Sequence, residues 1–208
     1  MSQLIDCLQL AANLFNQSTS GIIWNLFLAL IPLALSLYLF RSEIKSSFLW
    51  WILLIVFIAF LPNAPYVLTD SIHIIELSQK SYPLWAIIFI LIPQYALFIV
   101  AGFEAYVISL MRLETYLLGL VASQYLLLSK IIIHSLCVIG IYIGRFERFN
   151  SWDLVTKPVS VILTTIQDIL DGGKLLSMAI ALILIWLLTE LTRWANLKIS
   201  RAMKIDIL

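Results

Sequence analysis

The stretch FLWWILLIVFIAFLPNAPYVLTDSIHIIELS, residues 48–78, decides how the rest of the chain is interpreted. Residues 48–60 are apolar and predict a membrane helix, but Pro62 and Pro65 follow, and each lacks a backbone donor. From Phe48 to Leu61 a helix rises only about 20 Å, short of the hydrocarbon thickness of about 30 Å. An irregular backbone at membrane depth is tolerated where it is buried or lines a watery cavity. The segment therefore predicts a recess.

The composition places the whole chain in a membrane. Of 208 residues, 62% are hydrophobic and 12% are charged, with a mean hydropathy of +1.01. A soluble domain carries about 25% charged residues. The net charge of +1 gives no reason to expect a nucleic-acid partner. Cys7 and Cys137 do not suggest a disulfide framework, and residues 1–20, without Lys or Arg, do not resemble a cleavable signal peptide.

The apolar runs predict an all-α integral membrane bundle that forms a single domain over residues 1–208. About five transmembrane helices fit, because a crossing needs about 20 residues. Two interfacial amphipathic helices are expected in addition, over 1–20 and 158–170, where apolar residues recur on one helical face. The five spans are expected at about 21–40, 48–66, 84–111, 116–143 and 175–192.

The distribution of Lys and Arg predicts the orientation. One side would hold Arg41, Lys45, Arg112, Arg193, Lys198, Arg201 and Lys204. The other would hold Lys80, Arg145, Arg148, Lys157 and Lys174. The basic C-terminal tail favours a cytoplasmic C-terminus and an external N-terminus.

Three titratable residues follow the prolines at intervals of three. On a helix, Asp70, His73 and Glu76 occupy an arc of about 120°. A carboxylate–imidazole–carboxylate row can hold a divalent metal or supply a general base that a neighbour orients. The alternative is an amphipathic turn whose polar face meets water.

A second polar segment, GRFERFNSWDLVTKP at residues 144–158, is expected beside the first. Two crossings separate the segments, so both emerge on the same face of the membrane. Arginine forks at Arg145 and Arg148 suit phosphate or carboxylate, and the aromatic residues suit the headgroup layer. The segment predicts a clamp for a lipid phosphate or, alternatively, a juxtamembrane anchor with an Arg–carboxylate pair.

Ionisable residues also lie within the spans. Lys130 and His134 are one helical turn apart, and Glu104 lies towards the opposite end of the preceding span. Such groups are expensive in lipid and are expected to face the bundle interior. A Lys130–Glu104 pair would need tilt or a bridging water, because straight helices place them at levels about 10 Å apart. Lys130 and His134 could form a proton relay or a purely structural contact.

The motifs LPNAPYVLTDSIHI and GIYIGRFERFNSWDLVTKP, with WNLFLALIP from Trp24, resemble the bacterial multi-pass membrane proteins grouped as domain of unknown function 1361. The resemblance covers roughly residues 22–192, and it implies a bacterial plasma (inner) membrane. Phe149 stands where the family usually has a tryptophan. The family implies no activity, and the positions that match its motifs are Pro62, Asn63, Ala64, Pro65, Tyr66, Thr69, Asp70, His73, Gly144, Arg145, Phe146, Asn150, Ser151, Trp152 and Asp153.

Three functions remain open. The first is a membrane-embedded enzyme or lipid-processing factor that binds an amphiphilic, phosphate-bearing substrate, or another anionic small molecule, in a polar pocket at the membrane surface. The second is a non-catalytic membrane subunit or assembly factor, and the third is a small-solute carrier. The first assigns catalysis to Asp70 and His73. It assigns ligand binding to Asn63, Tyr66, Arg145, Arg148, Asn150, Trp152 and Asp153. No cofactor, resident metal or oligomeric state follows from the sequence.

Overall fold

The computed structural model describes residues 2–41, 47–79, 82–120 and 124–203. Its elements are helical throughout this part of the chain, as the sequence predicts. In chain order they are α1 (Ser2–Leu39), α2 (Phe48–Phe60), α3 (Asn63–Tyr66), the 3₁₀ helix η1 (Val67–Ser71), α4 (Ile72–Ser78), α5 (Leu84–Ala86), the π-helix η2 (Ile87–Leu91), α6 (Ile92–Leu118), α7 (Gln124–Arg145), α8 (Asp153–Thr156), α9 (Pro158–Leu170) and α10 (Gly172–Met203).

Five helical segments of the described chain are long and apolar enough to cross a membrane. They are Cys7–Leu39, Phe48–Ser78, Leu84–Leu118, Gln124–Arg145 and Gly172–Met203. Their length and composition confirm the all-α membrane fold class. Three positions used to predict the orientation, Lys45, Lys80 and Lys204, lie outside the described residues, as do residues 121–123 of the fourth predicted span.

The predicted break between an interfacial helix over 1–20 and a span over 21–40 is wrong, because α1 is a single helix. Its polar residues near the expected break bond to α6: Ser18 Oγ donates to Gln94 Oε1 at 2.7 Å, and Gln94 Nε2 donates to Thr19 Oγ1 at 3.0 Å. The polar side chains at this point of α1 are therefore partly bonded to a neighbouring helix.

The break expected at residues 112–115 is also displaced, since α6 continues to Leu118 and α7 begins at Gln124. Glu114 explains the extension. Its carboxylate accepts ion pairs from Lys130 at 3.2 Å and from Arg193 at 2.6 Å, so it contributes to the packed interior instead of a polar loop.

The NAPY segment keeps a helical path, contrary to the expected irregular backbone. Pro62 has φ −61° and ψ −24°, and Tyr66 N donates to Pro62 O at 3.1 Å. Polar side chains supply part of the missing hydrogen bonding: Asn63 Nδ2 donates to Phe60 O at 3.0 Å, and Thr69 Oγ1 donates to Tyr66 O at 2.8 Å. The prolines thus convert α-helix to short α and 3₁₀ turns without ending the helix.

Two glycines let neighbouring helices approach this segment closely. A Cβ added at Gly102 of α6 would lie 2.7 Å from Val67 Cγ1, and one added at Gly140 of α7 would lie 2.7 Å from the Pro62 ring. Small residues at helix contacts are typical of membrane bundles. The α3–η1 segment is therefore packed between α6 and α7.

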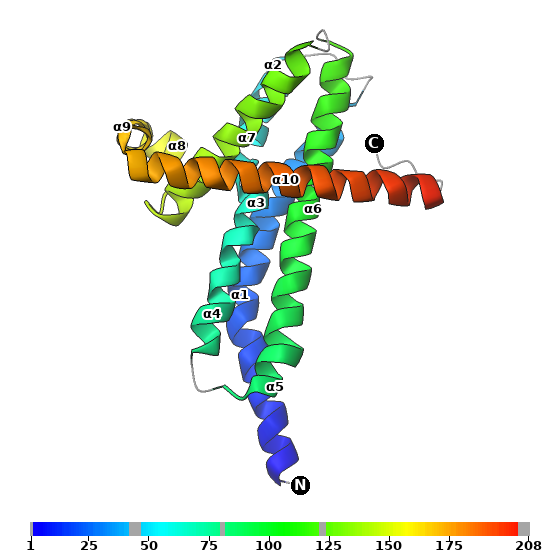
Figure 1. Cartoon of the computed structure of the whole chain (residues 1–208), viewed down its shortest axis with the longest axis vertical. Coiled ribbons are helices and arrows are strands. Elements are labelled where there is room, and N and C mark those ends of the chain that lie inside the picture. Colours follow the sequence, from blue (N-terminus) through cyan, green and yellow to red (C-terminus); the bar gives the residue numbers. More distant parts are fainter. Residues whose placement is uncertain (1, 42–46, 80–81, 121–123, 204–208) are drawn as a thin grey trace.

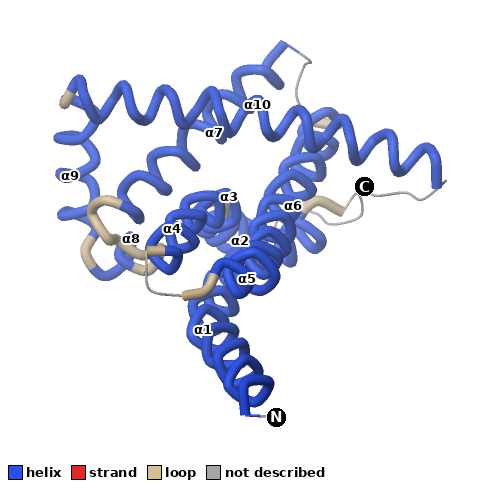
Figure 2. The backbone as a smooth tube through the Cα atoms, turned by 60° about the horizontal axis from the view of Figure 1, so that its bottom comes forward, coloured by secondary structure: helices blue, strands red, loops and turns tan. Residues whose placement is uncertain are grey.

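The helices do not all run side by side. Figure 1 shows α1, α4 and α6 extending along the long axis of the molecule, while α10 runs across α6. Figure 2 shows α9 at the edge of the molecule, beside α8 and α10. Polar contacts hold the crossing: Lys130 Nζ lies 3.3 Å from Glu190 Oε1, and Asn196 bonds to Glu104.

The intramembrane residues therefore pair differently from the suggested Lys130–Glu104 contact. Lys130 contacts Glu114 and Glu190, and Glu104 contacts Asn196 of α10. His134 is buried, with its ring 4.8 Å from that of Trp186. The crosswise course of α10 brings these groups together, which straight parallel spans would not do.

Candidate functional site

The two polar segments meet, as predicted from the number of crossings between them. Asn63 Nδ2 of α3 donates to Ser151 Oγ at 2.8 Å. Arg145 of α7 lies 3.8 Å from Asp70 Oδ1 of η1. The Tyr66 ring packs against Gly144, where an added Cβ would lie 3.5 Å from the ring. These contacts bring residues about 80 positions apart into one region.

A cavity of about 520 Å³ lies beside this junction. Its walls come from α1, α2, α3, α7, the loop after α7, α8 and α9. The volume falls in the range of about 300–1,000 Å³ that is usual for small-molecule sites. The polar residues of the junction that line it are Asn25, Asn63, Tyr66, Arg148, Asn150 and Ser151.

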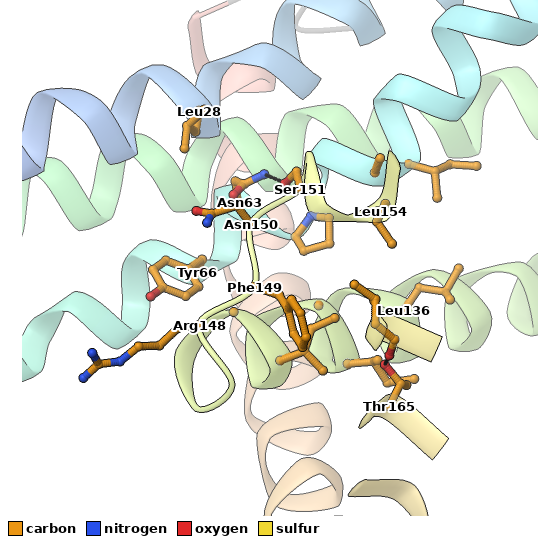
Figure 3. Close-up of a pocket in the computed structure, with 18 of the residues that line it drawn as sticks. Leu28, Asn63, Tyr66, Leu136, Arg148, Phe149, Asn150, Ser151, Leu154 and Thr165 are labelled. Atoms are coloured by element: carbon orange, nitrogen blue, oxygen red, sulfur yellow. Dashed lines mark hydrogen bonds between the residues drawn. The ribbon is translucent and has the colours of Figure 1, made fainter. Parts of the chain in front are cut away.

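The cavity has a polar end and an apolar end. Figure 3 shows the Tyr66 hydroxyl and the Arg148 side chain at one end, with the guanidinium extending outward, and Leu136, Leu154 and Thr165 towards the other end. The Thr165 hydroxyl is used within α9, where it donates to Val161 O at 2.7 Å. The apolar end therefore presents almost entirely hydrocarbon, and the arrangement suits an amphiphile.

Arg148 has an unusual backbone conformation for its residue type. Its φ is 57°, in the left-handed region where glycine is favoured, and Phe149 N donates to Ile143 O at 3.2 Å. This pattern resembles the helix C-terminal motif that normally contains glycine. A non-glycine residue there costs about 1 kcal/mol. Arg148 therefore occupies this turn at a local conformational cost.

Arg148 also differs from Arg145 in its electrostatic surroundings. Arg145 is partly buried and lies near Asp70, whereas Arg148 is exposed and makes no ion pair with any residue of the described ranges. Arg145 does not line the cavity, although the sequence assigned both arginines to ligand binding. The two arginines that were predicted to bind an anion thus have different surroundings, and Arg148 is the one that lines the cavity.

The predicted catalytic pair, Asp70 and His73, lies next to the cavity without lining it. Asp70 is 3% exposed and accepts a hydrogen bond from Asn25 Nδ2 at 2.6 Å. His73 Nε2 is 3.8 Å from Asp70 Oδ1, and His73 Nδ1 is 2.8 Å from Glu76 Oε2. The imidazole lies between two carboxylates, as the spacing suggested.

Two other predicted ligand-binding residues, Trp152 and Asp153, also lie outside the cavity lining. Asp153 Oδ2 accepts a hydrogen bond from Asn150 N at 2.7 Å, and Thr156 Oγ1 lies 3.3 Å from Asp153 Oδ1. The Asn150 N–H holds the pKa of the Asp153 carboxyl below its usual range. Asp153 therefore stabilises the turn that presents Asn150 and Ser151.

The described residues contain no group of three or more His, Cys, Asp and Glu side chains arranged to hold a metal ion. The Asp70–His73–Glu76 row has the donor types for one, but His73 is bonded directly to Glu76 instead of converging with it on a common point. No cofactor follows from this geometry.

Sequence reasoning missed several residues of the site. Asn25, the amide in an otherwise apolar stretch of α1, both lines the cavity and bonds to Asp70. A lone polar residue in a membrane span was the available signal, because such residues need an internal partner. The α9 residues Val161, Ile162, Thr165 and Ile166 also line the cavity. From the sequence, these residues were predicted only to form one face of an interfacial helix.

The fold and cavity define a multi-pass α-helical membrane protein with a small amphiphilic site. The chain belongs to the family described as "Protein of unknown function (DUF1361)", which it matches over residues 24–189. This finding confirms the resemblance carried by the WNLFLALIP, LPNAPY and GRFERFNSWD motifs. Comparisons with curated proteins and with solved structures found no match.

Proposed function

We propose that this protein binds a membrane amphiphile with an anionic, phosphate-bearing headgroup. The observation that carries the proposal is the two-ended cavity, with Arg148 at one end and hydrocarbon walls at the other. Arginine is suited to phosphate because its planar fork can donate two parallel hydrogen bonds. Tyr66 and Asn150, at the same end, supply further polar groups for headgroup oxygens.

The apolar walls support entry of the ligand from the bilayer. Six of the large apolar residues that line the cavity are also exposed on the molecular surface: Trp24, Ile58, Leu136, Leu154, Ile162 and Ile166. In a membrane-spanning chain, exposed apolar surface is suited to contact with acyl chains. The bacterial plasma membrane is the proposed location, and its lipids are the proposed source of the ligand.

Binding is tested most directly by variants of Arg148. The purified protein would be placed in phosphatidylcholine nanodiscs, and binding of a fluorescent phosphatidylglycerol analogue would be measured. Arg148→Gly removes the cation and fits the left-handed backbone, so we expect a folded protein whose affinity is lower by about tenfold. Arg148→Lys retains the positive charge without the planar guanidinium. Its affinity is expected to lie between those of the wild-type protein and Arg148→Gly.

Arg201→Gln provides the control, because Arg201 is exposed near the end of α10 and does not line the cavity. It removes one positive charge from the surface and is expected to leave binding unchanged. Equal binding by the wild-type protein and by Arg148→Gly would contradict the proposal. Loss in both Arg148→Gly and Arg201→Gln would indicate attraction by overall charge instead of a site.

A lipid-processing reaction is the second candidate, favoured by the contact between Asn25 and Asp70. Asn25 lines the cavity while its amide nitrogen bonds the Asp70 carboxylate, so it joins the titratable row to the binding site. In this proposal, Asp70 and His73 act as an acid/base pair. Turnover of the bound lipid should then be lost in His73→Ala with little change in thermal stability, because His73 is only partly buried. A non-catalytic subunit would bind the lipid and leave it unchanged.

A further inference from the structure

The cavity lining carries one formal charge. In the described part of the chain, Arg148 is the one Asp, Glu, Lys or Arg residue among those that line the cavity. Its guanidinium remains protonated at any physiological pH. The remaining walls are apolar or neutral polar, so the charge of a bound headgroup is balanced chiefly by this one side chain.

The other cations close to the cavity already have carboxylate partners. Arg145 lies 3.8 Å from Asp70, and Lys157 lies 3.9 Å from Asp153. Lys174 Nζ is 2.6 Å from Asp168 Oδ1 and 3.4 Å from Glu147 Oε1. A headgroup that recruited any of these cations would leave a carboxylate without its partner. Two of those carboxylates, on Asp70 and Asp168, are buried.

We propose that the cavity selects amphiphiles whose headgroup carries a single net negative charge, an inference that rests on the proposed function. One negative charge pairs with Arg148, whereas a second would meet only the neutral polar groups at that end of the cavity, with no further cation among the lining residues. A zwitterionic headgroup would pair its anion with Arg148, but the lining offers no carboxylate to its cation. A lipid phosphodiester and a fatty-acid carboxylate share the required charge.

The experiment compares headgroups in the same phosphatidylcholine nanodiscs. At pH 8, dilute phosphatidylglycerol has a singly charged phosphodiester, a fatty acid has a carboxylate, and phosphatidic acid has a phosphomonoester that is close to doubly charged. We expect phosphatidylglycerol to bind about tenfold more tightly than phosphatidic acid. The fatty-acid arm shows whether the site uses the charge alone or also the tetrahedral phosphate.

Changing the pH tests the charge within a single probe. The second pKa of a phosphomonoester is about 6, so lowering the pH from about 8 to about 5 reduces its charge from near −2 to near −1. We expect phosphatidic acid to bind about tenfold more tightly at the lower pH. Phosphatidylglycerol keeps one charge throughout and is the control for titration of the protein. The charged groups of the ion pairs around the cavity are Asp70, His73, Glu76, Arg145, Glu147, Asp153, Lys157, Asp168 and Lys174.

The outcomes separate this inference from the proposed function. Tighter binding of phosphatidic acid at pH 8 than at pH 5, with loss of binding in Arg148→Gly, would overturn charge selection and leave the lipid site intact. Equal binding of phosphatidylcholine and phosphatidylglycerol would also overturn it. The proposed function would instead be rejected if no anionic amphiphile bound, or if the affinity were the same for the wild-type protein and Arg148→Gly.

Discussion

At the scale of single residues, the region around the site depends on backbone space as well as on polar groups. Gly140 brings α7 against the Pro62 ring, and Gly144 leaves room for Tyr66. Arg148 adopts a conformation in which most residues are strained. These positions allow α3 and the end of α7 to form adjoining walls of the cavity.

Gly140→Ala should destabilise the protein, although alanine is the better helix former. The new Cβ would lie 2.7 Å from a proline ring that has little freedom to move, and overpacking costs about 1–3 kcal/mol. Gly21→Ala is the matched control, because nothing lies within 4 Å of its Cβ position in α1. Thermal unfolding in detergent should show a lower Tm for Gly140→Ala and an unchanged or higher Tm for Gly21→Ala. A Gly140→Ala protein as stable as wild type would mean that α7 and α3 can separate freely.

Arg148→Gly should be more stable than Arg148→Ala. Both substitutions remove the guanidinium, but glycine accepts the φ of 57° without strain, a difference of about 1 kcal/mol. For a chain of this size that corresponds to a Tm difference of about 2–4 °C. Comparing thermal unfolding of the two variants checks this. Equal Tm values would show that the left-handed turn contributes no strain.

At the scale of elements, two polar contacts position the segments on either side of the cavity. The turn before α8 is held by Asp153, and the junction of α9 with α10 is held by the pair of Asp168 and Lys174. Asp171 bonds the N–H groups of Gly173 and Lys174 at the start of α10. Since α9 forms one cavity wall, its attachment affects the site directly.

The contribution of Asp153 to stability should depend on pH. Its folded pKa lies below the usual value of 3.8, chiefly because it accepts the Asn150 N–H. The stabilisation is therefore present above pH 3.8 and is lost as the pH falls through the folded pKa. Asp153→Asn should lower the Tm at pH 6, and the difference from wild type should shrink below pH 3.8. A difference that stays constant as the pH falls further below 3.8, through the folded pKa, would show that the carboxylate charge is not involved.

Lys174→Met should loosen α9 by leaving Asp168 buried without its cation. Removing Lys174 leaves the buried Asp168 carboxylate without its cation, so the Tm is expected to fall. Adding Asp168→Leu should recover part of this loss, because the unpaired charge is then removed as well. Lys157→Met is the control, since Lys157 is largely exposed and its pair contributes at most about 1 kcal/mol. Thermal unfolding measures all three, and equal losses for the Lys174 and Lys157 variants would contradict the argument.

At the scale of the whole molecule, the described chain has five helical segments long and apolar enough to cross a membrane. The 38 residues of α1 extend about 57 Å, well beyond a hydrocarbon layer of about 30 Å. The helix is therefore longer than an untilted crossing needs. The family match over residues 24–189 begins within α1, so the first turns of this helix lie outside the matched region.

The orientation can be tested with the two native cysteines. Cys7 is exposed near the start of α1, whereas Cys137 is buried in α7. With the N-terminus external, an impermeant maleimide added to intact cells should label wild-type protein and not Cys7→Ser. Labelling that requires opened cells would place the N-terminus in the cytoplasm.

The class of protein and the proximity of its two polar motifs could be predicted from the amino-acid sequence. Apolar runs must form helices in lipid because their backbone groups have no other hydrogen-bonding partners, and LPNAPY and GRFERFNSWD lie two crossings apart. Both statements follow from local composition and counting. The helix boundaries were harder to predict from the sequence, as the continuous α1 shows. The hydrogen-bond partner of Ser18 and Thr19 lies in α6, far away along the chain.

The three-dimensional structure was needed to show which polar residues share a surface. It separates Arg145, held beside Asp70, from Arg148, which reaches the cavity, although both stand in one short motif. It also makes Asn25 and one face of α9 part of the site, and it brings α10 across α6. These outcomes depend on distances between side chains far apart in sequence, which helical periodicity along one segment does not contain.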